Sequence, residues 1–165
     1  MGRSTTPWTA PALIVLTIAA GAVPLSAEKP DVRARLIAPP GGQAGARVTL
    51  VVELTLGPHW HVNSHTPAET FLIPTELSLT MSAGTVSAVR YPAQVERRFA
   101  FSEKPLRVYE GTVRFEADLE MPANGAESAT VAGSLSYQAC NEQQCFAPAK
   151  MPLDAVVVVI RPPKN

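Results

Sequence analysis

The stretch Thr112–Glu120 reads TVRFEADLE and alternates apolar and polar side chains along its whole length. Successive side chains of a β-strand point to opposite faces of a sheet, so this period of two predicts a strand with one buried face. Residues 47–56 (RVTLVVELTL) repeat the pattern, with Val51 as the one interruption of the polar face. Shorter runs predict further strands at 32–37, 76–80, 86–91, 130–138 and 153–160.

Two details of these runs bear on the core. In the run 130–138, Val131, Leu135 and Tyr137 share one parity and are predicted to face inward. The run 153–160 is apolar on both parities (AVVVVI), which predicts a strand covered on both faces.

Turn-forming residues separate the predicted strands, for example at Gly57-Pro58, Ala83-Gly84 and Asn124-Gly125. The chain also contains 16 prolines and 10 glycines, which disfavour long helices because an interior proline removes a hydrogen bond and clashes with the preceding turn. Seven or more short strands with this spacing predict an all-β protein, an antiparallel β-sandwich.

The N-terminal residues 1–27 are predicted to be a secretory signal peptide. Arg3 supplies a positive charge, and the apolar run Ala10–Leu25 is followed by small residues. Cleavage is expected after Ala27, where polar residues begin, with Ala22 as the alternative. Residues 28–165 then form one exported domain, expected in an oxidising compartment, and no later segment reaches the roughly 20 apolar residues of a membrane span.

Composition excludes one class of partner. The net charge is 0 and charged residues make up 17% of the chain, so the chain lacks the excess of positive charge that nucleic-acid binding needs. We also find no nucleophile-elbow serine and no phosphate-binding glycine loop, and no cofactor is expected.

The two cysteines, Cys140 and Cys145, are the strongest candidates for chemistry. They are predicted to lie within disulfide reach, with Cα atoms roughly 4.4–6.8 Å apart. If the preceding strand continues, Cys140 shares the parity of Gln138, on the exposed face.

Three interpretations of the cysteine pair stay open: a redox pair, a purely structural bridge, or two metal ligands. A bridge over about six residues contributes only about 2 kcal/mol, which weakens the structural reading, and zinc sites commonly take four ligands.

The segment Tyr137-Gln138-Ala139-Cys140, followed by Cys145 and Pro148, resembles the active-site hairpin of the N-terminal periplasmic domain of the thiol:disulfide interchange protein DsbD. Other blocks resemble the family in the same order: His59–Asn63, Leu72–Thr75, Tyr91-Pro92, Phe99–Glu103 and Val108–Gly111. The resemblance covers nearly all of the chain after the signal peptide. It implies an immunoglobulin-like sandwich that passes reducing equivalents to periplasmic protein disulfides, that is, a protein-disulfide reductase.

The resemblance also implies roles for individual residues. Cys145 would attack the partner disulfide and Cys140 would resolve the mixed disulfide. Phe99 or Phe101 would belong to an aromatic cap loop over the pair; two inward residues of a strand are the alternative. Glu96, Glu103 or Tyr137 would tune the pair.

The family's full-length protein continues into a membrane electron-transfer domain and a thioredoxin-like domain, which do not follow Asn165 in this sequence. We therefore expect a separate thioredoxin-like or membrane protein as the electron donor. The rival hypothesis is a non-catalytic binding or assembly module with a structural Cys140–Cys145 disulfide.

His59, His61 and His65 are the remaining metal-ligand candidates. On a strand, His59 and His61 would share a face, which suits a metal ion. No nearby side chain completes a site, so the favoured reading has Trp60 and Val62 in the core and the histidines in solvent.

Overall fold

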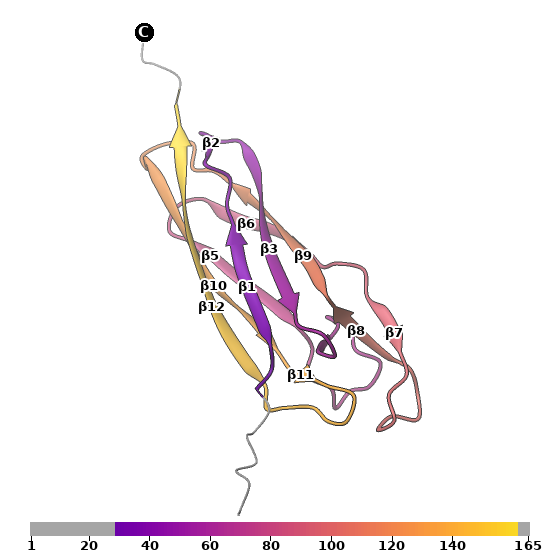
Figure 1. Cartoon of the computed structure of the whole chain (residues 1–165). Helices are drawn as coiled ribbons and strands as arrows, with labels where there is room; N and C mark the ends of the chain where they lie inside the picture. The colour runs from indigo at the N-terminus through magenta and orange to yellow at the C-terminus, as the bar shows by residue number, and fades with distance from the viewer. Residues whose placement is uncertain (1–28, 162–165) are drawn as a thin grey trace, which may run out of the picture.

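The computed structural model describes residues 29–161, so the predicted signal peptide lies outside the described residues (Figure 1). Within this range the chain forms β-strands and no helix, as predicted. The strands are β1 (Val32–Ile37), β2 (Gly41–Gln43), β3 (Arg47–Leu56), β4 (His61–Asn63), β5 (Glu76–Met81), β6 (Thr85–Arg90), β7 (Val95–Arg97), β8 (Leu106–Glu110), β9 (Thr112–Glu120), β10 (Ser128–Tyr137), β11 (Ala139–Cys140) and β12 (Ala149–Ile160).

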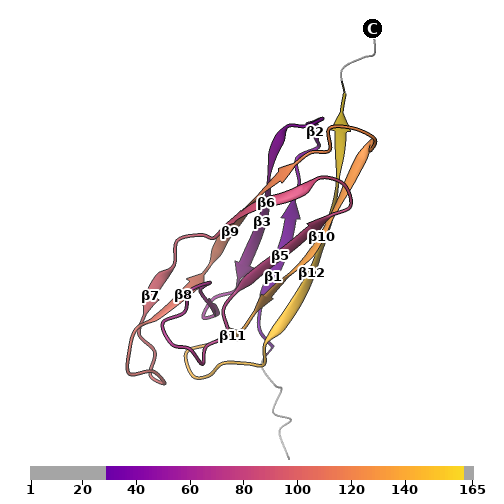
Figure 2. The same cartoon turned by 180° about the vertical axis from the view of Figure 1, so that it is seen from behind.

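Two four-stranded sheets form the sandwich, with strand orders β1-β3-β9-β6 and β2-β12-β10-β5. All pairs in them are antiparallel except β12 with β2. A third sheet, with the order β11-β4-β8-β7, lies at the end of the sandwich opposite to β2 (Figures 1 and 2). The architecture is an immunoglobulin-like β-sandwich with a small additional sheet at one end.

The main core fills the space between the two large sheets. Phe115 of β9 has no exposed surface, and its ring forms T-shaped contacts with Tyr91 and Tyr109, each at a centroid distance of 5.7 Å. The inward positions of both sheets complete this core: Leu50, Val52, Leu54, Leu119, Val131, Leu135, Tyr137, Leu153 and Val157. The side chains that the alternation in residues 112–120 and 130–138 predicted to face inward therefore lie in this core.

Two strands of the third sheet are directly connected in the chain to strands of the sandwich. β8 continues into β9 through the single residue Gly111, whose φ of 63° suits glycine because it has no Cβ. β10 likewise continues into β11 through Gln138. Strands from both large sheets thus meet at one end of the molecule, and this is where the cysteines lie.

A second, smaller hydrophobic cluster covers the outer side of this third sheet. Its buried members are Leu72, Leu106 and Val108, and the half-buried Phe99 packs against them. Leu72 comes from the loop between β4 and β5, and Phe99 comes from the loop between β7 and β8. Two loops are therefore tied to the third sheet by four side chains that are separate from the main core.

The strand predictions for 32–37, 47–56 and 112–120 match β1, β3 and β9 at both ends. One prediction is wrong: β12 is not covered on both faces. Leu153, Val157 and Val159 are buried, but Val156, Val158 and Ile160 are exposed by 62%, 49% and 52%. Their side chains point to the outer face of the sheet, over which no other element of the described chain packs.

Candidate active site

Cys140 and Cys145 form a disulfide at the end of a tight hairpin. Backbone hydrogen bonds flank the pair: the amide of Asn141 donates to the carbonyl of Gln144 (2.9 Å), and the amide of Phe146 donates to the carbonyl of Ala139 (2.8 Å). The cysteines thus face each other as a non-hydrogen-bonded antiparallel pair, in which Cα atoms approach to about 4.5 Å. Their Cα separation is 4.0 Å, so the predicted bridge is confirmed but the predicted range of separations is too long.

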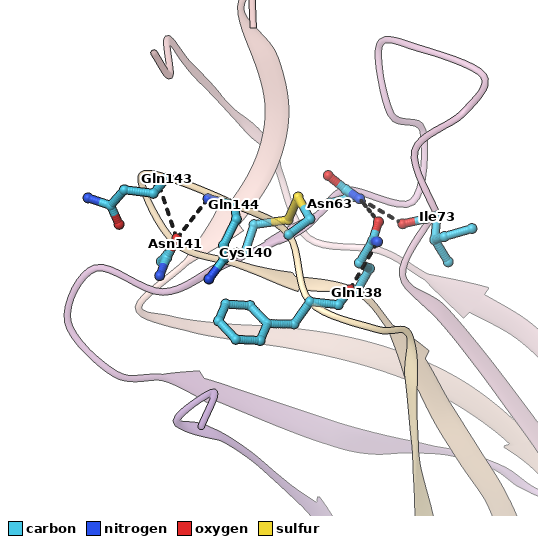
Figure 3. Close-up of a disulfide and its surroundings, with 9 residues drawn as sticks. Asn63, Ile73, Gln138, Cys140, Asn141, Gln143 and Gln144 are labelled. Carbon is cyan, nitrogen blue, oxygen red and sulfur yellow. Dashed lines mark hydrogen bonds between the residues drawn. A yellow bond between two sulfur atoms is a disulfide. The ribbon is translucent and has the colours of Figure 1, made fainter. Parts of the chain in front are cut away.

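Side chains hold the hairpin in this conformation (Figure 3). The Oδ1 atom of the buried Asn141 accepts hydrogen bonds from the backbone amides of Gln143 (3.0 Å) and Gln144 (2.9 Å), which closes the turn. On the other side of the bridge, Gln138 Nε2 donates to the carbonyl of Phe146 (3.1 Å), and Gln138 Oε1 accepts from Asn63 Nδ2 (3.3 Å). The bridge is therefore held from both sides by polar contacts.

The two sulfur-bearing residues differ in exposure. Cys140 has no exposed surface, whereas Cys145 is half-buried. The parity argument that placed Cys140 on an exposed face is wrong, because the strand stops at Tyr137. After Gln138 the chain starts the new strand β11, in which Cys140 pairs with His61 of β4. The exposed surface of the bridge therefore lies on the Cys145 side.

His61 is the cross-strand partner of Cys140 and is buried, so the prediction that the histidines lie in solvent is wrong for it. Burial lowers the pKa of His61 to about 4, although the charges of Glu110 and Glu142 act in the opposite direction. The predicted burial of Trp60 and Val62 is confirmed.

The other two histidines lie elsewhere. His59 is exposed and sits in the turn before β4 with a positive φ of 66°, so it does not share a strand with His61. His65 stacks on Tyr91 with a centroid distance of 3.6 Å. Among residues 29–161, no group of three or more His, Cys, Asp and Glu side chains is arranged to hold a metal ion.

Phe99 and Phe101 lie in the loop 98–105 between β7 and β8, as the loop prediction requires. Phe99 stacks on His61, with ring centroids 4.1 Å apart and planes 15° apart. Phe101 in turn stacks on Phe99, with ring centroids 5.3 Å apart, and is 40% exposed. The ring of Phe99 therefore covers the residue paired with Cys140; a direct contact of either ring with the sulfur atoms stays a prediction.

Sequence comparison assigns this arrangement to a family. The family model described as thiol:disulfide interchange protein DsbD, N-terminal, matches residues 31–154, a range that contains both cysteines and the loop 98–105. The chain belongs to this family. It has no significant match among curated proteins.

Two solved structures similar to this DsbD N-terminal family member are themselves N-terminal domains. The periplasmic N-terminal domain of ScsB from Proteus mirabilis shares 20% identity at a TM-score of 0.48, over 74% of this chain and 45% of that one. The reduced DsbD N-terminal domain from Neisseria meningitidis shares 14% identity at a TM-score of 0.40, over 71% of this chain and 86% of that one. The chain thus spans less than half of the ScsB structure.

In this DsbD-type site, the predicted tuning residues lie on three different elements of the fold. Glu96 is exposed on β7, 3.9 Å from Arg107, and Glu103 is exposed in the loop 98–105. Tyr137 is buried at the end of β10, and burial raises its pKa. No contact of these three residues with the cysteines is seen, and their tuning role stays a prediction.

Two acidic residues that the sequence analysis did not single out neighbour the residues of the DsbD-type bridge, one opposite His61 and the other between the two cysteines. Glu110 is the cross-strand partner of His61 on β8 and accepts hydrogen bonds from Arg97 Nε at 2.9 and 3.0 Å. Glu142 lies in the hairpin turn, 3.9 Å from His59. Together they help to line an open groove of about 1070 Å³, whose other walls include His59, His61, Phe99 and Phe101. Only the strand register, which sequence spacing does not provide, brings Glu110 to this place.

Proposed function

We propose that the chain is a periplasmic thiol–disulfide exchange domain that passes reducing equivalents from a thioredoxin-like donor to disulfides of partner proteins. Membership in the DsbD N-terminal family and the Cys140–Cys145 disulfide support thiol–disulfide exchange in general. The observation that carries the finer proposal is the unequal exposure of the two cysteines: an exchange pair needs one sulfur open to attack and a second within reach.

The exposure also supports the assignment of roles. In the reduced domain, the Cys145 thiolate attacks one sulfur of the partner disulfide, and the other partner sulfur leaves as a thiolate, which takes a proton from water. Cys140 then attacks Cys145, which releases the second partner thiol and leaves the Cys140–Cys145 bridge. Two electrons have moved from the domain to the partner, and a thioredoxin-like or membrane-bound donor returns the domain to the dithiol form.

Export fits this chemistry. We propose that residues 1–27 act as a signal peptide and that residues 28–165 work in the periplasm, an oxidising compartment in which disulfides persist. Among the described residues, no helix has the length and hydrophobicity needed to span a membrane. The acceptor disulfides are accordingly proposed to be those of periplasmic proteins.

The reduction potential tests the exchange function against the rival, a binding module whose bridge is only structural. We expect a potential above about −300 mV, because exchange-active bridges are less stable than structural ones. The measurement equilibrates the protein with defined glutathione or thioredoxin redox buffers and counts alkylated thiols. A bridge that stays closed at potentials below this value would favour the binding module.

Removal of the cap is expected to open the bridge to small molecules. If Phe99 shields the site, and the open state is populated at about 0.1–10%, Phe99→Ala should raise the rate of reduction by dithiothreitol about tenfold or more. Phe101→Ala is the matched control and should act less, because Phe101 stacks on Phe99 and not on His61. An unchanged reduction rate in Phe99→Ala, together with a stability loss typical of a buried phenylalanine, would mean that this ring is ordinary core.

A further inference from the structure

Three buried side-chain atoms of the described residues have no hydrogen-bond partner: His61 Nε2, Asn63 Oδ1 and Ser64 Oγ. Native proteins leave few such atoms, so each one calls for an explanation. These three atoms belong to β4 and to Ser64, the residue that follows it, and His61 is the one that pairs directly with a cysteine. The unpartnered nitrogen of His61 therefore lies at the candidate active site and not elsewhere in the core.

The strand register fixes what His61 can reach. Cross-strand partners in an antiparallel pair send their side chains to the same face, with Cβ atoms about 4.5–5.5 Å apart. His61 and Cys140 are such partners, while the stacked ring of Phe99 covers the imidazole at 4.1 Å. In the disulfide form Cys140 has no proton to share. In the dithiol form its Sγ–H becomes a donor, and His61 Nε2, in the tautomer that carries the proton on Nδ1, is an acceptor without another partner.

We propose that His61 is the base that takes the proton from the Cys140 thiol when Cys140 resolves a mixed disulfide. This inference rests on the proposed exchange function and adds a proton acceptor to it. Cysteine reacts as the thiolate, and burial in apolar surroundings disfavours that form, so a buried resolving thiol such as Cys140 needs a base.

The step balances as follows. The proton of Cys140 Sγ moves to His61 Nε2, and the resulting thiolate attacks Sγ of Cys145. The Cys140–Cys145 bond forms as the bond between Cys145 and the partner sulfur breaks. The departing partner thiolate receives the proton from His61, so the imidazole ends neutral. No further oxidant or reductant takes part, and the reverse sequence opens the bridge.

The surrounding charges suit a base that begins neutral. Burial keeps the imidazole unprotonated at neutral pH, since its pKa is lowered to about 4. A forming thiolate next to it favours the imidazolium, as an opposite charge within about 4–6 Å does. The other charged groups nearby are Glu110 on β8, which is paired with Arg97, Glu142 in the hairpin turn beside His59, and Arg98 in the cap loop.

The test follows the two steps separately with reduced protein and dithionitrobenzoate, a small aromatic disulfide that releases a coloured thiolate at each step. Cys145 should give the first release and Cys140 the second. His61→Phe keeps an aromatic ring beneath Phe99 but removes both nitrogens. We expect the first phase to be unchanged and the second to slow by about a hundredfold at neutral pH, the usual contribution of a general base. The second phase should then rise steeply with pH as the thiol ionises unaided.

Matched variants keep the outcome interpretable. His65→Phe is the control, because His65 is also stacked on an aromatic ring but pairs with no cysteine, and both phases should stay at their wild-type rates. His61→Gln is a second variant that keeps a polar side chain without a useful base, and it should slow the second phase as His61→Phe does. A second phase with the wild-type rate and pH profile in both His61 variants would overturn the proposal.

The exchange function itself is checked in the same experiment. A Cys140→Ser protein should show the first phase alone and retain the nitrobenzoate group. If it captures no reagent, the proposed function fails; if it captures the reagent while both His61 variants resolve normally, only the role of His61 fails.

Discussion

The Cys140→Ser variant is expected to accumulate as a stable mixed disulfide with a partner, joined through Cys145, whereas Cys145→Ser should yield about tenfold less or none. Exchange rates depend on access as well as on thiolate content, and Cys145 is the more accessible of the two residues. With Cys140 replaced, the first step can proceed but nothing resolves its product. Oxidised thioredoxin serves as a probe of the thioredoxin-like class, and non-reducing electrophoresis measures the complex.

A variant with both cysteines replaced by serine controls for cross-links that do not involve the pair. Strong trapping by Cys145→Ser and weak trapping by Cys140→Ser would reverse the assigned roles while leaving the pair redox-active. Absence of trapping in both single variants would argue that the bridge takes no part in exchange with this class of protein.

Phe115→Ala is expected to lower the free energy of unfolding by about 3–5 kcal/mol, the range found when a fully buried phenylalanine is truncated. Phe115 has no exposed surface and forms T-shaped contacts with both Tyr91 and Tyr109. Its loss removes apolar burial and leaves a cavity at the centre of the main core. Urea denaturation, with the midpoint and slope both fitted, measures the change.

Phe101→Ala makes the same substitution at a ring that is 40% exposed and lies in the loop 98–105. Its cost should stay near 0.5–1 kcal/mol, roughly the value of one aromatic stacking contact. Equal losses for the two variants would contradict the division between a rigid core and a loosely attached loop 98–105.

Much of the fold follows from local pattern. The alternation in Arg47–Leu56 and Thr112–Glu120 reports which face of a strand is buried, and both strands begin and end where predicted. The exposure of the outer face of β12 could not be predicted in this way. Apolar residues on both parities are compatible with a strand covered twice or once, and only the tertiary arrangement leaves Val156 and Val158 exposed.

The candidate site was predictable in its cysteines but not in its surroundings. Spacing and the polar turn between Cys140 and Cys145 indicated the bridge, which the structure contains. The parity argument failed at Gln138, because one irregular residue resets the side-chain alternation between β10 and β11. His61 was assigned no role beyond that of a metal-ligand candidate, since its pairing with Cys140 depends on a register between strands far apart in the sequence.

The small cluster of Leu72, Leu106, Val108 and Phe99 has a consequence for the motions of the molecule. Proteins open in cooperative pieces, and pieces held by few buried contacts open at a lower free energy than the global transition. The loop carrying Phe99 and the loop carrying Leu72 share this one cluster, so we expect loss of its packing to loosen both together. We then expect these two loops to fluctuate as a single subglobal unit while the sandwich stays folded.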